Sequence, residues 1–181
     1  MIHLMPVSDS NDLDTDLKQI YLDSFPDNER REWNEMQQLL LHPLFNVCRI
    51  IQNGTLIGFI SFWKWPHLLF IEHFALNELA RGKGIGTRIL KQIIDENPST
   101  IIVEVEEPLT EQANRRIAFY QRLEFVLCQQ EYYQPPYTHG NDKVKMSIMS
   151  YPQLLTYEEF TIVKKQIYKE VYKWDNYTDF P

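Results

Sequence analysis

A glycine-rich basic segment between two apolar runs constrains this 181-residue chain more than any other feature. Residues 70–76 form an apolar, β-rich run, residues 81–87 read RGKGIGT, and apolar residues then recur at helical spacing up to residue 95. The pattern predicts a strand, a loop and a helix that begins inside the loop. Glycines let the backbone approach a ligand, and a helix N-terminus offers unpaired N–H groups with a partial positive charge. Since Arg81 and Lys83 add charge, we expect an anion such as a pyrophosphate to bind here.

Other phosphate-binding loops do not fit this segment. A Walker A loop requires Gly-Lys-Ser/Thr after four intervening residues, and that sequence is absent. The Rossmann fingerprint G-x-G-x-x-G differs in spacing, because this loop reads G-x-G-x-G. A glycine-rich turn without a ligand remains as the structural alternative. The strand, the basic loop and the amphipathic helix in register make that alternative the weaker one.

Charge and composition limit the partners. The formal net charge of −7 disfavours nucleic acid, because phosphate backbones require a basic face. It weakly favours a cationic or neutral substrate. No His, Cys or Asp spacing resembles a zinc site, and Cys48 and Cys128 form no CxxC pair, so we expect no metal. The apolar region at 56–76 is interrupted by Lys64 and Glu72, and the start lacks a signal peptide's pattern. We therefore expect no membrane partner and a cytoplasmic location.

The order of elements indicates an α/β or α+β fold with a mostly antiparallel sheet. Asn53-Gly54, between two β-rich runs, is a strong hairpin signal. The predicted strands cover residues 2–7, 45–51, 56–63, 68–76, 101–105, 125–132 and 144–149. The predicted helices cover 17–25, 84–95 and 111–123, and a second helical region follows the first, with Asp27 as its N-cap, Trp33, Met36 and Leu40 at helical spacing, and Pro43 at its end. We expect a single domain over residues 1–181, in which 151–181 form a C-terminal helical extension.

The last helix has its own start signal. Residues 156–159, Thr-Tyr-Glu-Glu, form a capping box. The residues expected on its apolar face are Phe160, Val163, Ile167 and Val171. This face packs on the protein's own core or on a partner chain. Aromatic residues expected to be exposed make a homodimer possible: Tyr168, Tyr172 and Trp174.

Two blocks of this sequence resemble a known family. Residues 81–86, RGKGIG, match the R/Q-x-x-G-x-G/A signature of the GNAT superfamily, the Gcn5-related N-acetyltransferases. Residues 103–105 followed by Asn114 and residues 118–125, AFYQRLEF, resemble its "fYerlGF" block. The resemblance covers roughly residues 56–149. Two residues depart from it: Glu78 stands where many members have Pro, and Glu124 where Gly is usual.

The resemblance implies a GNAT-like fold: a twisted, mostly antiparallel mixed sheet with helices on both faces, here with an added C-terminal helix. It implies an N-acetyltransferase that moves the acetyl group of acetyl-CoA to a primary amine of a small molecule or peptide. A non-catalytic acyl-CoA-binding or regulatory module is the alternative. A nucleotide-binding domain is a third reading, and it predicts stabilisation by ATP rather than by CoA.

The resemblance also assigns site residues. Backbone groups of residues 74–76 would bind the pantetheine arm, residues 82–87 would hold the pyrophosphate, and Tyr120 would be the general acid that protonates the leaving thiolate. Asn114 would lie near the thiol end, and Phe119 would pack on the arm. The cofactor-binding residues expected in this way are Phe74, Ala75, Leu76, Arg81, Gly82, Lys83, Gly84, Ile85, Gly86, Thr87, Asn114 and Phe119.

Glu72 is the candidate general base. It is a carboxylate on an apolar strand, and such a group is paired, shifted in pKa or functional. The resemblance places it near the thioester, while a structural ion pair with a nearby Arg or Lys is the alternative. On a regular strand His73 would point to the opposite face, so the two cannot share a metal. Glu104 and Glu106 are expected to pair with Arg115 or Arg116.

The start of the second helical region has two interpretations. It either borders the pocket of the acceptor amine, as the family resemblance implies, or is an ordinary exposed helix start. The residues in question are Phe25, Asp27, Arg30, Arg31 and Trp33.

Overall fold

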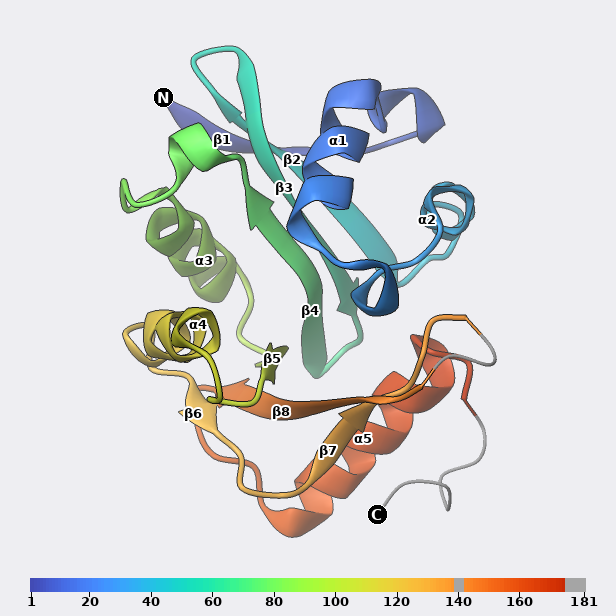
Figure 1. Cartoon of the computed structure of the whole chain (residues 1–181), viewed down its shortest axis with the longest axis vertical. Coiled ribbons are helices and arrows are strands. Elements are labelled where there is room, and N and C mark those ends of the chain that lie inside the picture. The colour runs from blue at the N-terminus through green and yellow to red at the C-terminus, as the bar shows by residue number, and fades with distance from the viewer. Residues whose placement is uncertain (139–141, 175–181) are drawn as a thin grey trace. The chain divides into compact units, whose positions relative to one another are not determined.

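The computed structural model describes residues 1–138 and 142–174, and the chain divides into two units, Met1–Ser99 and Thr100–Pro181. Apart from three short 3-10 turns, at Ser10–Asp12, Asp27–Glu29 and Glu78–Ala80, the first unit consists of helices and strands. In chain order these are β1 (Ile2–Pro6), α1 (Thr15–Ser24), α2 (Trp33–Leu39), β2 (Phe45–Gln52), β3 (Thr55–Lys64), β4 (Leu68–Leu76) and α3 (Ile85–Glu96) (Figure 1).

The strands of the first unit form an antiparallel series. β1 pairs with β2, β2 with β3, and β3 with β4. The β2–β3 hairpin turns at Asn53 and Gly54, whose φ angles of 52° and 82° are those that a two-residue hairpin turn requires. The hairpin predicted from Asn53-Gly54 is therefore confirmed.

Helices cover both faces of this sheet (Figure 1). On one face Tyr21 of α1 packs its ring against Phe59 of β3 and His73 of β4, at centroid distances of 5.9 and 5.2 Å. On the other face, α3 buries the apolar stripe predicted from its sequence, which contains Ile85, Ile89 and Ile93. Burial of these apolar stripes is the main term that holds helices on a sheet.

The second unit is built around one central strand. In chain order it contains β5 (Thr100–Glu106), α4 (Glu111–Gln121), β6 (Val126–Leu127), β7 (Tyr132–Gln134), β8 (Val144–Tyr151) and α5 (Tyr157–Glu170). β8 pairs antiparallel with β5 along one edge and with β6 and β7 along the other. Every strand pair described within a unit is thus antiparallel, which confirms a mostly antiparallel α/β fold.

The C-terminal helix α5 packs on its own unit. Its capping box is formed, because Thr156 accepts from the Glu159 N–H and Glu159 accepts from the Thr156 N–H. Phe160 and Tyr168 lie against the ring of Tyr132, at centroid distances of 6.4 and 5.6 Å. All four residues of the predicted apolar face are buried: Phe160, Val163, Ile167 and Val171.

The expected exposure is wrong for two of the three C-terminal aromatics, while Trp174 is half-buried. Tyr168 is 0% exposed and Tyr172 is 6% exposed, both within this chain. The buried Tyr168 hydroxyl is satisfied by donating to the Tyr133 carbonyl, and the Tyr172 ring packs on Tyr137. These two residues therefore give no support to a homodimer. Within the described residues, no helix is long and apolar enough to cross a bilayer.

Candidate functional site

The loop before α3 contains two glycines in the left-handed region. Gly84 is the N-cap of α3 with φ 72° and ψ 3°, and Gly82 has φ 73°. A side chain is strained in this conformation, so the turn into the helix favours glycine at both positions. The space beside both α-carbons is open, since no atom lies within 4 Å of where a β-carbon would stand. A ligand can therefore approach this backbone closely.

The N-terminus of α3 has the properties of an anion site. Gly84 provides no side-chain cap, and the first turn contains no acidic residue. The first N–H groups of a helix have no partner within the helix, and they carry the positive end of its dipole. Arg81, Gly82, Lys83 and Gly84 are all exposed. These residues fit a pyrophosphate, which is the group that the resemblance predicted for this loop.

The end of β4 is tied to the same loop. Nε of Arg81 donates to the Leu76 carbonyl at 2.8 Å, and the Asn77 side chain accepts from the Ala80 N–H at 3.0 Å. Residues 74–76 pair with residues 58–60 of β3. The structure therefore brings the predicted pantetheine-binding strand end and the predicted pyrophosphate loop together in the first unit.

Tyr120 lies in the last turn of α4, in the second unit, and is 7% exposed. Its ring packs edge-on against Phe119 and Phe125, at centroid distances of 5.2 and 5.4 Å. Burial raises the pKa of its hydroxyl to about 12; among the smaller effects, Arg116 lowers this pKa and Glu106 raises it. Within the described part of the chain this hydroxyl has no hydrogen-bond partner. A neutral phenol with an unused proton is what a general acid requires.

A cap holds the end of α4 next to Tyr120. Glu124 has φ 68°, its N–H donates to the Gln121 carbonyl at 3.0 Å, and the Phe125 N–H donates to the Tyr120 carbonyl at 3.2 Å. These two bonds are the pattern of a Schellman cap, whose left-handed position is usually glycine. The Glu that departs from the family pattern here therefore adopts the glycine conformation and keeps the turn.

The other two predicted residues of α4 are placed differently. The Asn114 amide donates to the carbonyls of Pro108 and Thr110, at 3.2 and 2.9 Å, so it anchors the loop before its own helix. Phe119 is half-buried beside Tyr120. Tyr120, Asn114 and Phe119 share one helix of the second unit, whereas Glu72 and the glycine loop belong to the first.

A bulge changes the direction of side chains on β4. Ser61 pairs with His73 and Phe62 pairs with Ile71, so Glu72 is the extra residue between them. The expectation that Glu72 and His73 point to opposite faces is wrong, because this bulge breaks the alternation. Both side chains reach the segment between α1 and α2: Glu72 contacts Arg31, and His73 packs on Phe25 at 4.6 Å. No cluster of metal-ligating side chains is found in the described ranges.

The Glu72 carboxylate is bound by two side chains, Arg31 and Trp63. Arg31 approaches Oε1 with Nε at 3.1 Å and Nη2 at 2.9 Å, and Trp63 Nε1 donates to Oε2 at 2.8 Å. The side chains of Arg31 and Glu72 are 7% and 0% exposed. This contact is the structural ion pair with a nearby Arg or Lys that is the alternative to a base role for Glu72.

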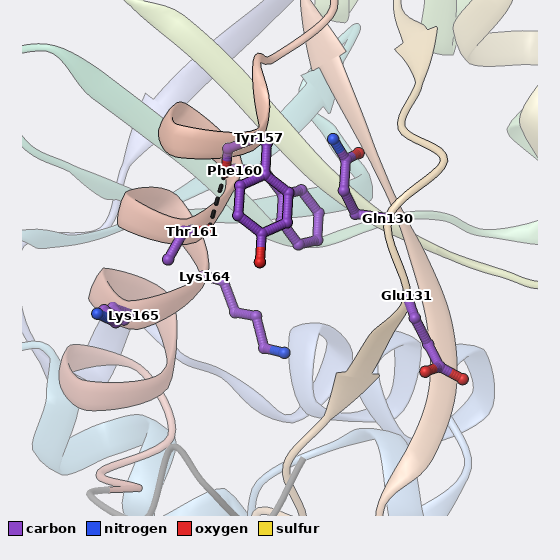
Figure 2. Close-up of a pocket in the computed structure, with 7 residues that line it drawn as sticks. All are labelled: Gln130, Glu131, Tyr157, Phe160, Thr161, Lys164 and Lys165. Carbon is purple, nitrogen blue, oxygen red and sulfur yellow. Dashed lines mark hydrogen bonds between the residues drawn. The ribbon is translucent and has the colours of Figure 1, made fainter. Parts of the chain in front are cut away.

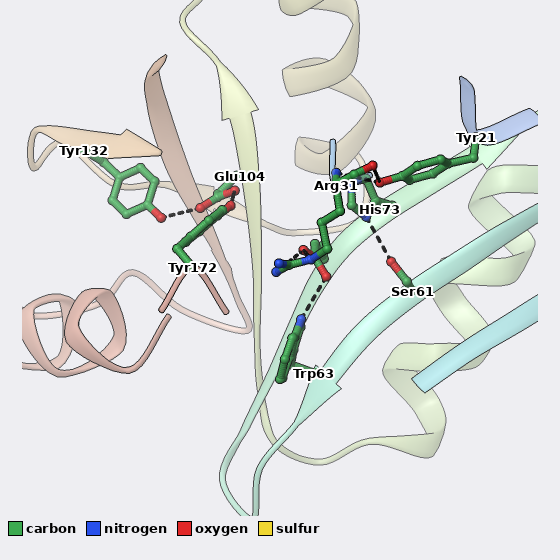
Figure 3. A network of polar contacts seen from close by, with 9 residues as sticks. Tyr21, Arg31, Ser61, Trp63, His73, Glu104, Tyr132 and Tyr172 are labelled. Carbon is green, nitrogen blue, oxygen red and sulfur yellow. Dashed lines mark hydrogen bonds and ion pairs between the residues drawn. The ribbon is translucent and has the colours of Figure 1, made fainter. Parts of the chain in front are cut away.

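Tyr21 holds the backbone of Arg31. Its hydroxyl donates to the Arg31 carbonyl at 3.1 Å and accepts from the Arg31 N–H at 2.8 Å (Figure 3). Arg31 is thus fixed at its backbone by α1 and at its side chain by β4, and it is not part of an exposed helix start. Trp63 was not predicted as a partner, since nothing in the sequence marks an indole as a hydrogen-bond donor to a residue of another strand.

The carboxylates of β5 have different partners. Glu106 pairs with Arg116 at 2.7 Å, as expected. Glu104 instead accepts from the hydroxyls of Tyr132 and Tyr172, the latter at 2.6 Å (Figure 3). Arg115 pairs with Glu111 one helical turn away, so the expected pairing of Glu104 with Arg115 or Arg116 is replaced by two phenols.

The comparisons with known proteins decide the family. Residues 12–125 match the family model described as the Acetyltransferase (GNAT) family, well over half of the chain. The chain belongs to the GNAT acetyltransferases. This GNAT chain is also 27% identical, over 119 residues, to YjbC of Bacillus subtilis, whose name describes it as an acetyltransferase. That match covers 64% of this chain and 61% of YjbC, so the chain spans less than two thirds of this relative.

Solved GNAT structures share the fold. One from Bacteroides thetaiotaomicron, described as a GNAT-family acetyltransferase, is 31% identical with a TM-score of 0.89, and the match covers 96% of this chain and 99% of that one. The Arabidopsis thaliana NAA60 structure in complex with acetyl-CoA is 18% identical with a TM-score of 0.62, covering 83% and 98% of the two chains. The similarity to NAA60 shows the fold, and acetyl-CoA is the ligand of that neighbour.

Proposed function

We propose that this GNAT-family protein transfers the acetyl group of acetyl-CoA to a primary amine on a small molecule or a peptide. The observation that carries the proposal is the uncapped N-terminus of α3 with left-handed glycines at 82 and 84. Residues 1–181 would act as one acetyltransferase domain. The family match over residues 12–125 supports this, because it continues across the boundary between the two units.

The residues of this chain have distinct proposed roles. The N–H groups of residues 82–87 bind the pyrophosphate of acetyl-CoA, and Arg81 and Lys83 attract it. Backbone groups of residues 74–76 bind the pantetheine arm. Tyr120 donates its proton to the thiolate as the carbon–sulfur bond breaks, and burial keeps that proton on the hydroxyl at neutral pH. The net charge of −7 supports a cationic amine as the acceptor.

The base role predicted for Glu72 stays a prediction. A general base needs access to the proton that it takes, and here the carboxylate is 0% exposed and bound by Arg31 and Trp63. This geometry supports the structural alternative, in which Glu72 fixes Arg31 and water accepts the proton of the amine. Both roles are distinguishable by experiment, because only one of them requires a proton acceptor at residue 72.

Thiol release tests the proposed function directly. The full chain is incubated with acetyl-CoA and a panel of primary amines, covering amino acids, polyamines and peptides with free N-termini. We expect amine-dependent release of CoA for at least one class, with the acetylated amine identified by mass spectrometry. CoA binding without turnover on any amine would instead support the non-catalytic acyl-CoA-binding module. Stabilisation by ATP but not by CoA would contradict both.

A further inference from the structure

A cavity lies entirely within the second unit, on the side of α5. It has a volume of about 280 Å³ and lies between the first half of α5 and the segment that leads into β7 (Figure 2). The residues that matter for its chemistry are Gln130, Glu131, Tyr157, Phe160, Lys164 and Lys165. None of them belongs to the glycine loop or to the Tyr120 region, so the cavity is separate from the residues proposed for acetyl transfer.

The lining combines an apolar surface with positive charge. Phe160 is 4% exposed and provides a buried ring, while Tyr157 is 74% exposed at the rim. Lys164 extends from α5 toward the segment with Gln130 and Glu131 (Figure 2), and its ammonium lies 5.4 Å from the Tyr168 ring. Lys165 adds a second positive charge, while Glu131 accepts a hydrogen bond from the Tyr133 hydroxyl at 3.0 Å.

Two polar groups in this cavity are desolvated. Oε1 of Gln130 is buried, and within the described residues it has no hydrogen-bond partner. A buried acceptor without a partner is unfavourable, and most such atoms in folded proteins have one. Burial also lowers the pKa of Lys164, with Lys143 adding to the effect and Glu131 opposing it. A ligand that donates to the amide oxygen and brings a negative charge to the lysine would relieve both.

We infer that this cavity binds a small monocarboxylate that bears an apolar group and a hydroxyl or N–H donor. The carboxylate binds Lys164, the apolar group packs on Phe160 and Tyr157, and the donor satisfies Oε1 of Gln130. The volume lies at the lower end of ligand pockets, which limits the ligand to a compact molecule. The inference concerns a site apart from acetyl transfer and does not depend on the proposed function.

An NMR titration of the full-length, isotopically labelled protein with phenyllactate tests the site. Phenyllactate carries the carboxylate, the hydroxyl and the ring, and it has no amine that the enzyme could acetylate. We expect shifts of the amide signals of residues 130–131 and 157–165, with a Kd on the order of 10⁻⁴–10⁻³ M. No shift at these residues at 10-fold above this range (roughly 10⁻² M) would overturn the inference.

Variants and analogues separate specific binding from general attraction. Lys164→Gln should weaken binding by roughly 10-fold, because a charge-assisted hydrogen bond is lost, while Lys169→Gln on the same helix should not. Neutral phenyllactamide should bind at least about 10-fold more weakly than phenyllactate. Equal affinity of the wild type and Lys164→Gln, or of acid and amide, would overturn the assignment. Displacement of phenyllactate by equimolar inorganic phosphate would overturn it too, since it would indicate a site for any anion.

Discussion

Nη2 of Arg31 lies 2.9 Å from Oε1 of Glu72, and both side chains are almost completely buried. Breaking such a pair on one side leaves an uncompensated charge in the interior, which typically costs about 3–5 kcal/mol. We expect Glu72→Gln to cost less, about 2–3 kcal/mol, because the amide still accepts from Trp63. Chemical denaturation measures this loss. Turnover per folded molecule should be largely retained.

The same variant decides the role of Glu72. If turnover falls by a factor of about 10²–10⁴ at neutral pH and recovers at high pH, as free amine accumulates, Glu72 is the base. Arg31→Met is the matched control, since it disrupts the pair without removing a carboxylate. A double-mutant cycle then shows how much of the stability loss the two residues share.

Tyr120→Phe removes only the proposed proton donor. Because the hydroxyl has no partner among the described residues, we expect the unfolding free energy to stay within about 0.5 kcal/mol. Turnover should fall by roughly 10²–10⁴-fold with CoA affinity unchanged. Since burial raises the pKa of Tyr120 to about 12, the acid form persists at lower pH and is lost only as pH rises through that value. A rate profile that declines near pH 8 through loss of the Tyr120 proton would contradict the assignment.

Glu124 offers a test on stability alone. Its φ of 68° is strained for a residue with a side chain, so Glu124→Gly should stabilise the protein by about 1 kcal/mol. Glu124→Ala serves as the control, because it removes the carboxylate and keeps the β-carbon. If Gly and Ala give the same change, the strain at this position is not the cause. Thermal unfolding of the three proteins in parallel provides the comparison.

His73 predicts a dependence of stability on pH. Burial lowers its pKa from 6.5 to about 4, with Glu72 opposing the effect and Arg31 adding to it. The unfolded chain therefore binds a proton at His73 that the folded protein does not, and stability falls as pH drops from about 6.5 toward 4. The loss should reach about 3 kcal/mol, from about 1.4 kcal/mol per pKa unit. His73→Gln should flatten the curve in this range; an unchanged curve would assign the dependence to other groups.

Much of the fold was predictable because local signals agree with the packing. The strand at 45–51, the Asn53-Gly54 turn and the capping box at 156–159 each depend on neighbouring residues alone, and the structure has all three. The helix predicted over 84–95 is α3, Ile85–Glu96. Where a periodic pattern and a terminal signal coincide, the sequence alone is enough to place the helix or strand.

The site was less predictable because it depends on contacts between distant residues. The bulge at Glu72 shifts the register of β4 and so changes the face on which side chains lie. The alternation of apolar and polar residues in the sequence does not reveal such a bulge. The burial of Tyr172 depends on Tyr137 and on Glu104, which lies 68 residues earlier in the chain. Such partners are set by tertiary packing, and the residue types alone are compatible with several of them.

Calorimetric titration of CoA into the wild type and Gly84→Asp tests the central claim most directly. The variant adds a carboxylate at the N-terminus of α3, where the backbone is open and the pyrophosphate is proposed to bind. Gly84→Ala controls for left-handed strain, and Gly54→Asp places the same charge at another left-handed glycine of the first unit. We predict that a folded Gly84→Asp loses CoA affinity by at least about 100-fold, as expected when an anion loses its donors and meets a like charge, while Gly54→Asp binds normally. Unchanged CoA affinity in folded Gly84→Asp would contradict the account.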